Sequence, residues 1–279
     1  MASLPADVPL LSVKSSRVKA ARRLARRVSR AEKRLFLAEG PQSVREALEL
    51  PGCAVEVFAL PGAAEEHREI YRRAAANDVP WRLVDEPGLA SLTETVHPQG
   101  LVAVCRFLDR PLSDILPDSA ATGLVAVCAD VRDPGNAGTV IRSADAAGAG
   151  AVILTGSSVD PYNGKAVRAS AGSLFHVGLA IAPDAAVVIA ELRRRGFQVL
   201  AADGGGETDL DEAVDHGLLQ APTAWLFGNE AWGLPEELGA KADFRVRIPI
   251  HGRAESLNLA TAAAVCLYAS ARAQRRAAR

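Results

Sequence analysis

The sequence predicts an α/β protein of two domains, and three observations support this. Short apolar runs alternate with amphipathic stretches from residue 35 onward. A chain of 279 residues is also longer than one small core needs. A stretch at 108–122, with two prolines and three aspartates, interrupts the alternation without clear periodicity. We therefore expect domains at 1–107 and 123–279, joined by a surface linker at 108–122.

The N-terminal segment is strongly cationic, although the whole chain has a net charge of −1. Ten Lys or Arg residues lie between Lys14 and Arg34, against the single acid Glu32. Their spacing predicts one helix over about 13–34, with a cationic face and a narrow apolar face. Such a face is either solvated or binds a polyanion, and the near absence of interleaved acids favours RNA or DNA. The RNA contacts that we expect are Arg22, Arg23, Arg26 and Arg27.

The rest of the first domain reads as a small α/β unit. Its expected strands are 36–38, 55–60, 81–84 and 101–105, and its expected helices are 44–50, 65–75 and 87–92.

The second domain repeats the alternation with more continuously apolar strands. These strands are expected near 124–129, 151–154, 175–181, 197–202, 223–227 and 244–248. The helices are expected near 137–148, 164–171, 184–195, 235–240 and 256–275. Apolar strands of this kind are typical of a mostly parallel sheet that helices cover on both faces.

Two glycine clusters are weak signals for nucleotide binding. The glycines at 148 and 150 follow a helix and precede a strand, which is the wrong order for a phosphate-binding turn, so we expect a helix C-cap. The run 204–206 follows a strand but lacks a third glycine at the required spacing, so we expect a mobile turn. A dinucleotide-binding dehydrogenase is therefore a minor alternative.

Composition argues against several classes of protein. The four cysteines form no CxxC pair and have no histidines at metal-binding spacing, so we expect reduced thiols and no metal. The N-terminus lacks the order of a secretory signal, and no apolar run is long enough to span a membrane. We expect a cytoplasmic protein.

Three polar or glycine-containing runs each follow an expected strand and precede an expected helix. They lie at 136–142, 228–233 and 248–258. Open α/β sheets bind their ligands at the carboxyl ends of the strands, so we expect these runs to form an active site. Asn136 could equally cap a helix, since its side-chain oxygen can accept a hydrogen bond from the first turn.

Together the three runs resemble the signature motifs of the SPOUT superfamily, specifically its SpoU/TrmH branch of RNA 2′-O-ribose methyltransferases. The matching segments are DVRDPGNAG through Arg142, LFGNEAWGLP around Glu230, and RIPI through SLN at 256–258. The stretch 159–172 resembles the family's connecting segment, with Gly164 where a proline is more usual. Upstream, 36–40 and 97–100 resemble an RNA-binding domain with a fold like certain ribosomal proteins.

This resemblance implies a catalytic domain with a C-terminal trefoil knot, S-adenosylmethionine as the methyl donor, and a homodimer that completes each site. By motif position it assigns cofactor contacts to Gly228, Ile248 and Leu257, with Ala201 as a weaker candidate. Relatives with this kind of appended domain commonly modify ribosomal RNA, which is our expected substrate. A transfer-RNA 2′-O-methyltransferase and a non-catalytic RNA-binding protein for ribosome assembly are the alternatives.

The resemblance also assigns catalytic roles. Arg142 matches the family's functional arginine, and because a guanidinium keeps its proton at neutral pH, we expect it to bind the phosphate beside the target ribose rather than act as a base. Asn136 and Glu230 are expected to shape the loops, and Ser256 and Asn258 to serve the substrate or to cap the last helix. Lys165 and Arg168 are about one helical turn apart and could meet phosphates together, or could belong to a solvated face.

Overall fold

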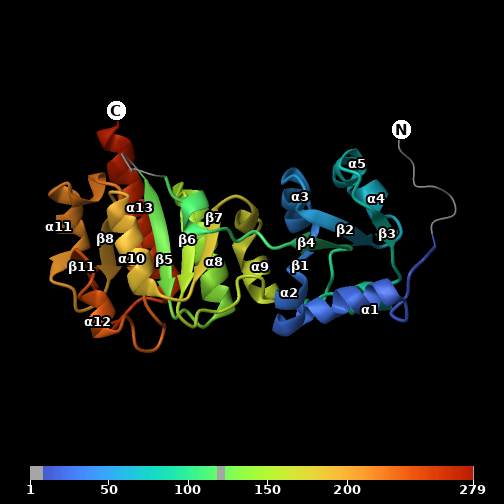
Figure 1. Cartoon of the computed structure of the whole chain (residues 1–279), viewed down its shortest axis with the longest axis horizontal. Helices are drawn as coiled ribbons and strands as arrows, with labels where there is room; N and C mark the ends of the chain where they lie inside the picture. The colour runs from blue at the N-terminus through green and yellow to red at the C-terminus, as the bar shows by residue number, and fades with distance from the viewer. Residues whose placement is uncertain (1–8, 118–122, 279) are drawn as a thin grey trace. The chain divides into compact units, whose positions relative to one another are not determined.

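Two β-sheets organise the chain, each in its own unit (Figure 1). The structure is a computed structural model that describes residues 9–117 and 123–278. The first unit ends at Leu108 and also contains Asp160–Phe175, which we expected in the second domain. The second unit holds Asp109–Val159 and the chain from His176 onward. Residues 1–8, which carry the expectation of no secretory signal, lie outside the described residues.

The first sheet has the strand order β1-β4-β2-β3. Its strands are β1 Leu35–Glu39, β2 Ala54–Ala59, β3 Trp81–Leu83 and β4 Leu101–Arg106. Strand β4 pairs antiparallel with β1 and β2, and β2 pairs parallel with β3. The helices of this unit are α1 Ser16–Arg22, η1 Arg23–Ala25, α2 Arg27–Lys33, α3 Pro41–Glu49, α4 Ala63–Glu66, α5 Arg68–Ala76, α6 Glu86–Ala90, α9 Gly164–Ser170 and η2 Ser173–Phe175.

The helix expected over 13–34 is wrong as a continuous element. Arg26 is extended between η1 and α2, with φ −93° and ψ 130°. Arg30 is buried instead of facing solvent, because its guanidinium binds Asp160 at 2.7 Å and donates to the carbonyls of Leu24 and Ala25 at 2.9 and 2.8 Å. A buried cation is stable only when it is paired in this way, and the pairing turns the chain at the break.

An aromatic cluster explains why 160–175 belongs to the first unit. Phe107 stacks on Tyr162 with ring centroids 3.8 Å apart, and Phe36 lies 4.9 Å from the same tyrosine ring. The Tyr162 hydroxyl accepts a hydrogen bond from the Leu108 amide at 2.7 Å. A large buried aromatic side chain with a satisfied hydroxyl stabilises the segment strongly.

The second sheet has the strand order β7-β6-β5-β10-β8-β11-β9, and all of its pairs are parallel, as predicted. Its strands are β5 Leu124–Ala129, β6 Ala151–Thr155, β7 Gly178–Ala182, β8 Gln198–Ala202, β9 Thr208–Asp209, β10 Thr223–Phe227 and β11 Phe244–Arg247. Its helices are α7 Leu112–Ile115, α8 Pro134–Ala147, α10 Ala185–Arg194, α11 Leu210–Asp215, η3 Leu218–Gln220, α12 Glu236–Gly239 and α13 Leu259–Ala277.

Helices cover both faces of this sheet (Figure 1). Val125 and Val127 of β5 pack in one core with Val188 and Leu192 of α10. The opposite face is covered by α8 and α13, which pack on each other and on β5. On that face the buried Trp225 indole donates to Ser270 of α13 at 2.8 Å. Helix α13, which follows β11 in sequence, therefore packs beside α8 on this face of the sheet. The trefoil knot stays a prediction of the family resemblance.

The linker expected at 108–122 is wrong over 109–117. This segment contains α7, whose Leu112 and Ile115 pack on the second core, and Leu116 is buried. The buried Arg195 donates to the Leu116 carbonyl at 2.6 Å and so holds the end of the segment. Residues 118–122, the rest of the predicted linker, lie outside the described residues.

The C-cap predicted at Gly148 is confirmed, because Gly148 ends α8 in the left-handed conformation at φ 81°. Within the described residues, no helix is long and apolar enough to cross a membrane. Over the same residues, no group of three or more His, Cys, Asp or Glu side chains could hold a metal ion.

Candidate active site

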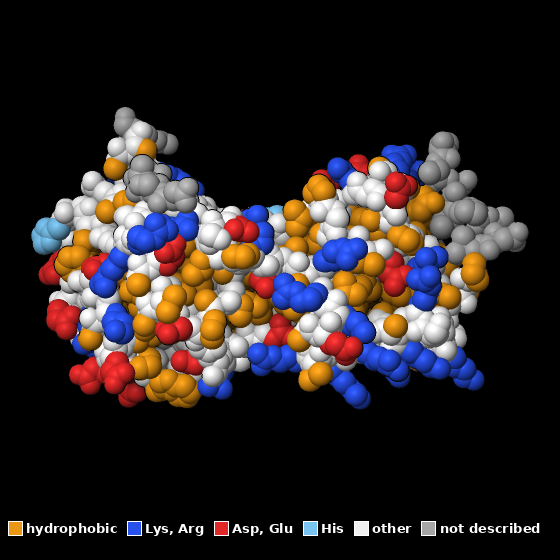
Figure 2. All heavy atoms as spheres, in the orientation of Figure 1, with side chains coloured by type: hydrophobic (Ala, Val, Ile, Leu, Met, Phe, Trp, Pro, Cys, Tyr) orange, Lys and Arg blue, Asp and Glu red, His pale blue; other side chains and the backbone are white. Residues whose placement is uncertain are grey.

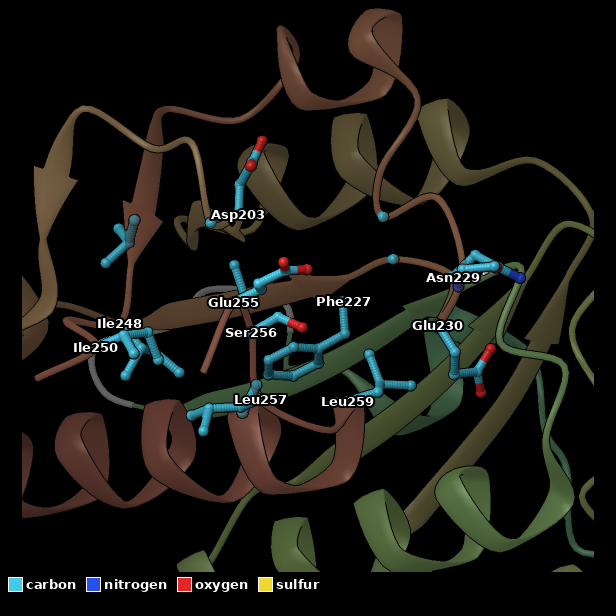
Figure 3. A pocket seen from close by; sticks show the side chains of 17 residues that line it. Asp203, Phe227, Asn229, Glu230, Ile248, Ile250, Glu255, Ser256, Leu257 and Leu259 are labelled. Atoms are coloured by element: carbon cyan, nitrogen blue, oxygen red, sulfur yellow. Dashed lines mark hydrogen bonds between the residues drawn. The ribbon is translucent and has the colours of Figure 1, made fainter. Parts of the chain in front are cut away.

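A cavity of about 330 Å³ lies where the chain leaves the carboxyl ends of β8, β10 and β11 (Figure 3). Parallel strands end at the same edge of a sheet, and this brings segments about 25 residues apart in sequence together. Figure 3 shows Ile248, Ile250 and Leu257 at one end of the cavity and Glu230 at the other. The lining residues are Ala202, Asp203, Gly204, Phe227, Gly228, Asn229, Glu230, Ala231, Gly233, Val246, Ile248, Ile250, Glu255, Ser256, Leu257, Leu259 and Ala262.

Gly228 begins a tight turn that only glycine fits. A Cβ atom on Gly228 would lie 2.3 Å from the carbonyl carbon of Gly233. Asn229 and Gly233 exchange two backbone hydrogen bonds, of 2.8 and 2.9 Å, which close the turn. The Asn229 side chain also donates to the Asp130 carbonyl at 2.7 Å and so attaches this turn to the segment that follows β5. The wall of the cavity is therefore backbone held in a fixed shape.

A hydrogen-bond network joins three of the predicted catalytic residues. The Asn136 amide group donates to Glu230 Oε1 at 3.1 Å, and its oxygen accepts from Asn258 Nδ2 at 3.1 Å. Glu230 also accepts hydrogen bonds of 3.1 Å from the backbone amides of Arg132 and Asp133. One side chain from each predicted motif thus contributes to a single chain of hydrogen bonds at the cavity.

These contacts favour the ionised form of Glu230. Partial burial opposes the charge, but the hydrogen bonds donated by its own backbone amide, by Arg132 and Asp133, and by the Asn136 side chain outweigh burial and lower the pKa of Glu230. The carboxylate therefore serves as an acceptor for the loop after β5. Among the described residues, these amides are the partners of the Glu230 carboxylate, and no arginine side chain pairs with it.

The capping role considered for Asn136 belongs to Asp133. Helix α8 begins at Pro134, and the Asp133 side chain accepts from the Asn136 backbone amide at 2.8 Å. This frees the Asn136 side chain for the network. Asn258 caps α13, because its oxygen accepts from the Ala260 amide at 2.9 Å, and its amide donates to Asn136. Its contact with substrate stays a prediction.

The predicted cofactor residues fall on the cavity with one exception. Gly228, Ile248 and Leu257 line it, whereas Ala201 is buried inside β8 and its neighbour Ala202 lines the wall. The residue that lines the cavity at the end of this strand is therefore Ala202, one position after the predicted Ala201. Apolar side chains at one end, and exposed backbone and carboxylates elsewhere, suit a nucleoside-containing ligand, and the volume falls in the range of about 300–1,000 Å³ typical of small-molecule sites.

The loop after β8 is the part of the site that sequence reasoning missed. Asp203 and Gly204 line the cavity, although we expected only a mobile turn at 204–206. Arg245 holds Asp203 at 2.7 Å, and the Gly205 amide donates to the same side chain at 2.9 Å. Burial opposes ionisation of Asp203, but these two contacts lower its pKa. The position of this loop directly after a strand of the parallel sheet was the sequence signal that could have identified it as part of the site.

Ser256 lines the cavity, but Arg142 does not. Figure 3 shows the Ser256 hydroxyl pointing toward the Glu230 end of the cavity. Arg142 is exposed on α8, and its side chain makes no hydrogen bond or ion pair with any described residue. It follows Asn136 by six residues, about 9 Å along the axis and about 240° around it. The structure thus brings together four of the five predicted catalytic residues.

The predicted RNA contacts in the first unit divide into two groups. Arg22, Arg23, Arg26 and Arg27, here called the arginine cluster, are exposed and make no side-chain hydrogen bond or ion pair with described residues. Figure 2 shows Lys and Arg side chains gathered on the surface formed by α1 and α2. Lys165 is exposed on α9.

Arg168 is already neutralised, because Glu39 and Glu94 each bind its guanidinium at 3.1 Å. These ion pairs make it a structural residue of the first unit rather than a phosphate contact.

Comparison with known proteins agrees with this geometry. Residues 123–268 match the SpoU rRNA Methylase family, and residues 15–103 match the MRM3-like substrate binding domain. The chain is 31% identical over 265 residues to the 23S rRNA (guanosine(2553)-2′-O)-methyltransferase RlmP of Bacillus subtilis. The matched region covers 92% of this chain and 96% of that protein.

Solved structures show the same similarity over nearly the whole length. The AdoMet-bound rRNA methyltransferase from Sinorhizobium meliloti is 34% identical with a TM-score of 0.80, over 94% of this chain and 98% of that one. The SpoU methyltransferase AviRb from Streptomyces viridochromogenes, in complex with AdoMet, is 30% identical with a TM-score of 0.81, over 95% and 100%. The family model covers more than half of the chain, and the relatives match both units, so this chain belongs to the SpoU rRNA Methylase family.

Proposed function

We propose that this protein transfers the methyl group of S-adenosylmethionine to a ribose 2′-hydroxyl of ribosomal RNA in the cytoplasm. The observation that carries the proposal is the cavity at the ends of β8, β10 and β11, which Glu230 lines and to which Asn136 and Asn258 are joined by hydrogen bonds through Glu230. Two relatives that match both units, RlmP of Bacillus subtilis and RlmB of Neisseria meningitidis, are 23S rRNA 2′-O-methyltransferases, which supports this substrate class.

The cavity suits S-adenosylmethionine. The adenine would lie against Ile248, Ile250 and Leu257, and the backbone of the Gly228 turn would offer hydrogen bonds where a side chain has no room. When bound, this cofactor supplies an activated methyl group on a sulfonium. Binding of AdoMet by two solved relatives with TM-scores of about 0.8 supports the assignment.

Methyl transfer asks the protein chiefly to align the acceptor oxygen and to help its proton leave. Arg142 has an unpaired guanidinium suited to a phosphate fork, so it would fix the nucleotide and stabilise developing negative charge. Ser256 is an exposed hydroxyl at the cavity wall and would bind near the ribose. Asn136 and Glu230 position the loop from which α8 begins, and Asn258 connects it to α13.

We further propose that the enzyme is a homodimer. Arg142 does not line the cavity of its own chain, and α13 exposes Val265 and Tyr268, which are 37% and 52% accessible. A second copy could cover these side chains and bring an Arg142 toward each cavity. In this arrangement the first unit recruits RNA through the arginine cluster, whose four charges would bind phosphates.

The experiment is incubation of the protein with labelled S-adenosylmethionine and either unmodified 23S rRNA or tRNA, both transcribed in vitro, followed by mapping of the methylated ribose. We expect label in 23S rRNA. Label only in tRNA would overturn the substrate, and cofactor binding absent from calorimetry would indicate a non-catalytic RNA-binding protein.

Arg142→Ala should remove most methyl transfer while leaving cofactor affinity within about twofold, because its guanidinium is assigned to RNA. An equal loss of cofactor affinity would contradict that assignment. Arg110, also exposed in this unit, offers an arginine control in Arg110→Ala, for which we expect unchanged transfer.

A further inference from the structure

Trp232 exposes a large aromatic surface at the rim of the cavity. Its side chain is 60% accessible, whereas Trp225, in the strand that leads to the same loop, is fully buried. The residues on both sides of it, Ala231 and Gly233, line the cavity. An indole left in solvent at such a place forgoes the burial that usually stabilises this side chain, so a contact is available to a ligand.

The loop that carries Trp232 is held in place before any ligand binds. Its two ends are joined by the paired backbone hydrogen bonds between Asn229 and Gly233. Inside the loop, the Asn229 side-chain oxygen accepts from the Ala231 amide at 2.8 Å. A side chain presented by a preformed loop loses little further conformational entropy when it binds.

Arg132 provides a cation on the loop after β5, and Glu230 attaches that loop to the one that carries Trp232. Glu230, two residues before Trp232 in sequence, accepts a hydrogen bond of 3.1 Å from the Arg132 backbone amide. The Arg132 side chain is exposed and makes no hydrogen bond or ion pair with other described residues. Glu230 therefore joins a loop that carries an exposed indole to a loop that carries an unpaired guanidinium, at the edge of the cavity.

We propose that Trp232 stacks on a base of the RNA substrate at or next to the target nucleotide, with Arg132 contacting a neighbouring phosphate. The proposal rests on the proposed function and adds the residue that selects an unstacked nucleotide. Bases in loops and single strands are commonly splayed out and held on aromatic faces, whereas bases inside a duplex are not available. A flat indole beside a cation suits a base and its phosphate better than it suits a protein surface.

The test compares Trp232→Ala, Trp232→Leu and Trp232→Phe in the full chain, with unmodified 23S rRNA transcript as the probe. Base stacking on an aromatic ring predicts a rise in KM for RNA of roughly 10- to 100-fold in the alanine and leucine variants. The phenylalanine variant keeps a π face and should stay within about threefold. The value of kcat and the Kd for S-adenosylmethionine should change little in all three. Val187→Ala is the matched control, because Val187 is also 60% exposed but lies on α10.

Tryptophan fluorescence gives a second readout that does not need catalysis. In a Trp81→Phe background the emission comes from Trp225 and Trp232, and only the second is accessible. We expect RNA to quench the accessible emission, and the quenching to disappear when Trp232 is also replaced by phenylalanine.

Three results would overturn the proposal. They are an alanine variant with the KM of the wild type, quenching that persists without Trp232, and an alanine variant that changes the oligomeric state rather than RNA affinity. The last would assign the indole to an interface between two copies. If the wild type transfers no methyl group, the proposed function fails, and the quenching experiment still decides whether Trp232 contacts RNA.

Discussion

The substitution Glu230→Gln tests whether the hydrogen-bond network at the cavity supports catalysis. Glu230 accepts three hydrogen bonds, each of 3.1 Å, from the amides of Arg132, Asp133 and Asn136. Glutamine keeps the size of the side chain but has one acceptor oxygen and an NH₂ group. Its NH₂ would face a backbone N–H, so at least one of the two backbone hydrogen bonds should be lost.

The expected magnitude follows from the exposure of this carboxylate. A hydrogen bond to a charged group contributes about 1.5–3 kcal/mol where water is excluded. Glu230 is exposed in this chain, and solvent screening reduces the total for its contacts to roughly 1–2 kcal/mol. At about 1.4 kcal/mol per factor of ten, kcat/KM for RNA methylation should fall about 5- to 30-fold.

The assay is single-turnover transfer of labelled methyl groups to 23S rRNA, with the Kd for S-adenosylmethionine from calorimetry. Glu237→Gln is the control, because Glu237 is exposed on α12 and lies outside the cavity. Since the contacts lower the pKa of Glu230, their benefit is present above its ordinary pKa and is lost as pH falls through the lowered value. The difference between wild type and variant should therefore shrink in acid. A glutamine variant with full activity at neutral pH would refute this reasoning.

Three further predictions follow from the same structure. Gly228→Ala should weaken S-adenosylmethionine binding at least tenfold in calorimetry, because its Cβ would lie 2.3 Å from Gly233, whereas Gly252→Ala, with no atom within 4 Å, should bind normally. Replacing the arginine cluster by alanine should reduce the slope of log Kd against log salt by roughly 3, since each phosphate contact contributes about 0.7; an unchanged slope, or the same reduction in the control Arg68→Ala with Arg72→Ala, would argue that the cluster does not bind RNA. Burial raises the pKa of the Cys128 thiol to about 12, so a thiol reagent at pH 8 should label Cys128 only after unfolding, and labelling of the folded protein would contradict this.

Local patterns in the sequence predict most of the second unit. Continuously apolar strands predicted a parallel sheet, and β5, β6, β8 and β10 begin and end within about a residue of their expected limits. Because parallel strands end at one edge, the strand pattern alone brings the runs after β5, β10 and β11 together. This is why Asn136, Glu230 and Asn258 could be grouped before their contacts were known.

The features that sequence reasoning missed depend on contacts between distant residues. The break at Arg26 follows from the burial of Arg30 against Asp160, 130 positions away, and a charge pattern cannot show which cation is buried. The sequence likewise does not show that Glu39 and Glu94 pair with Arg168, which therefore remained a candidate phosphate contact.

The glycine run at 204–206 was missed for a different reason. It matched no phosphate-binding spacing, but Gly206 is required because a Cβ there would lie 2.6 Å from the Arg245 carbonyl of β11. A comparison with phosphate-binding motifs does not detect this role, because the glycine is needed to let another backbone approach closely.

The two ends of the Asn136–Arg142 run face different directions, and this constrains how the enzyme can work. Asp133 and Asn136 fix the start of α8 against the cavity, while Arg142 lies about 9 Å further along the axis on another side of the helix. Arg142 does not line the cavity of its own chain, and the packing of α8 on α13 fixes the position of this helix. In the proposed dimer, Arg142 of a second copy reaches the cavity. If a second copy does so, specific activity should fall on dilution in parallel with dissociation of the dimer, and mixing Arg142→Ala chains with Gly228→Ala chains should restore activity to about a quarter of the wild type, since half of the dimers are mixed and each has one complete site.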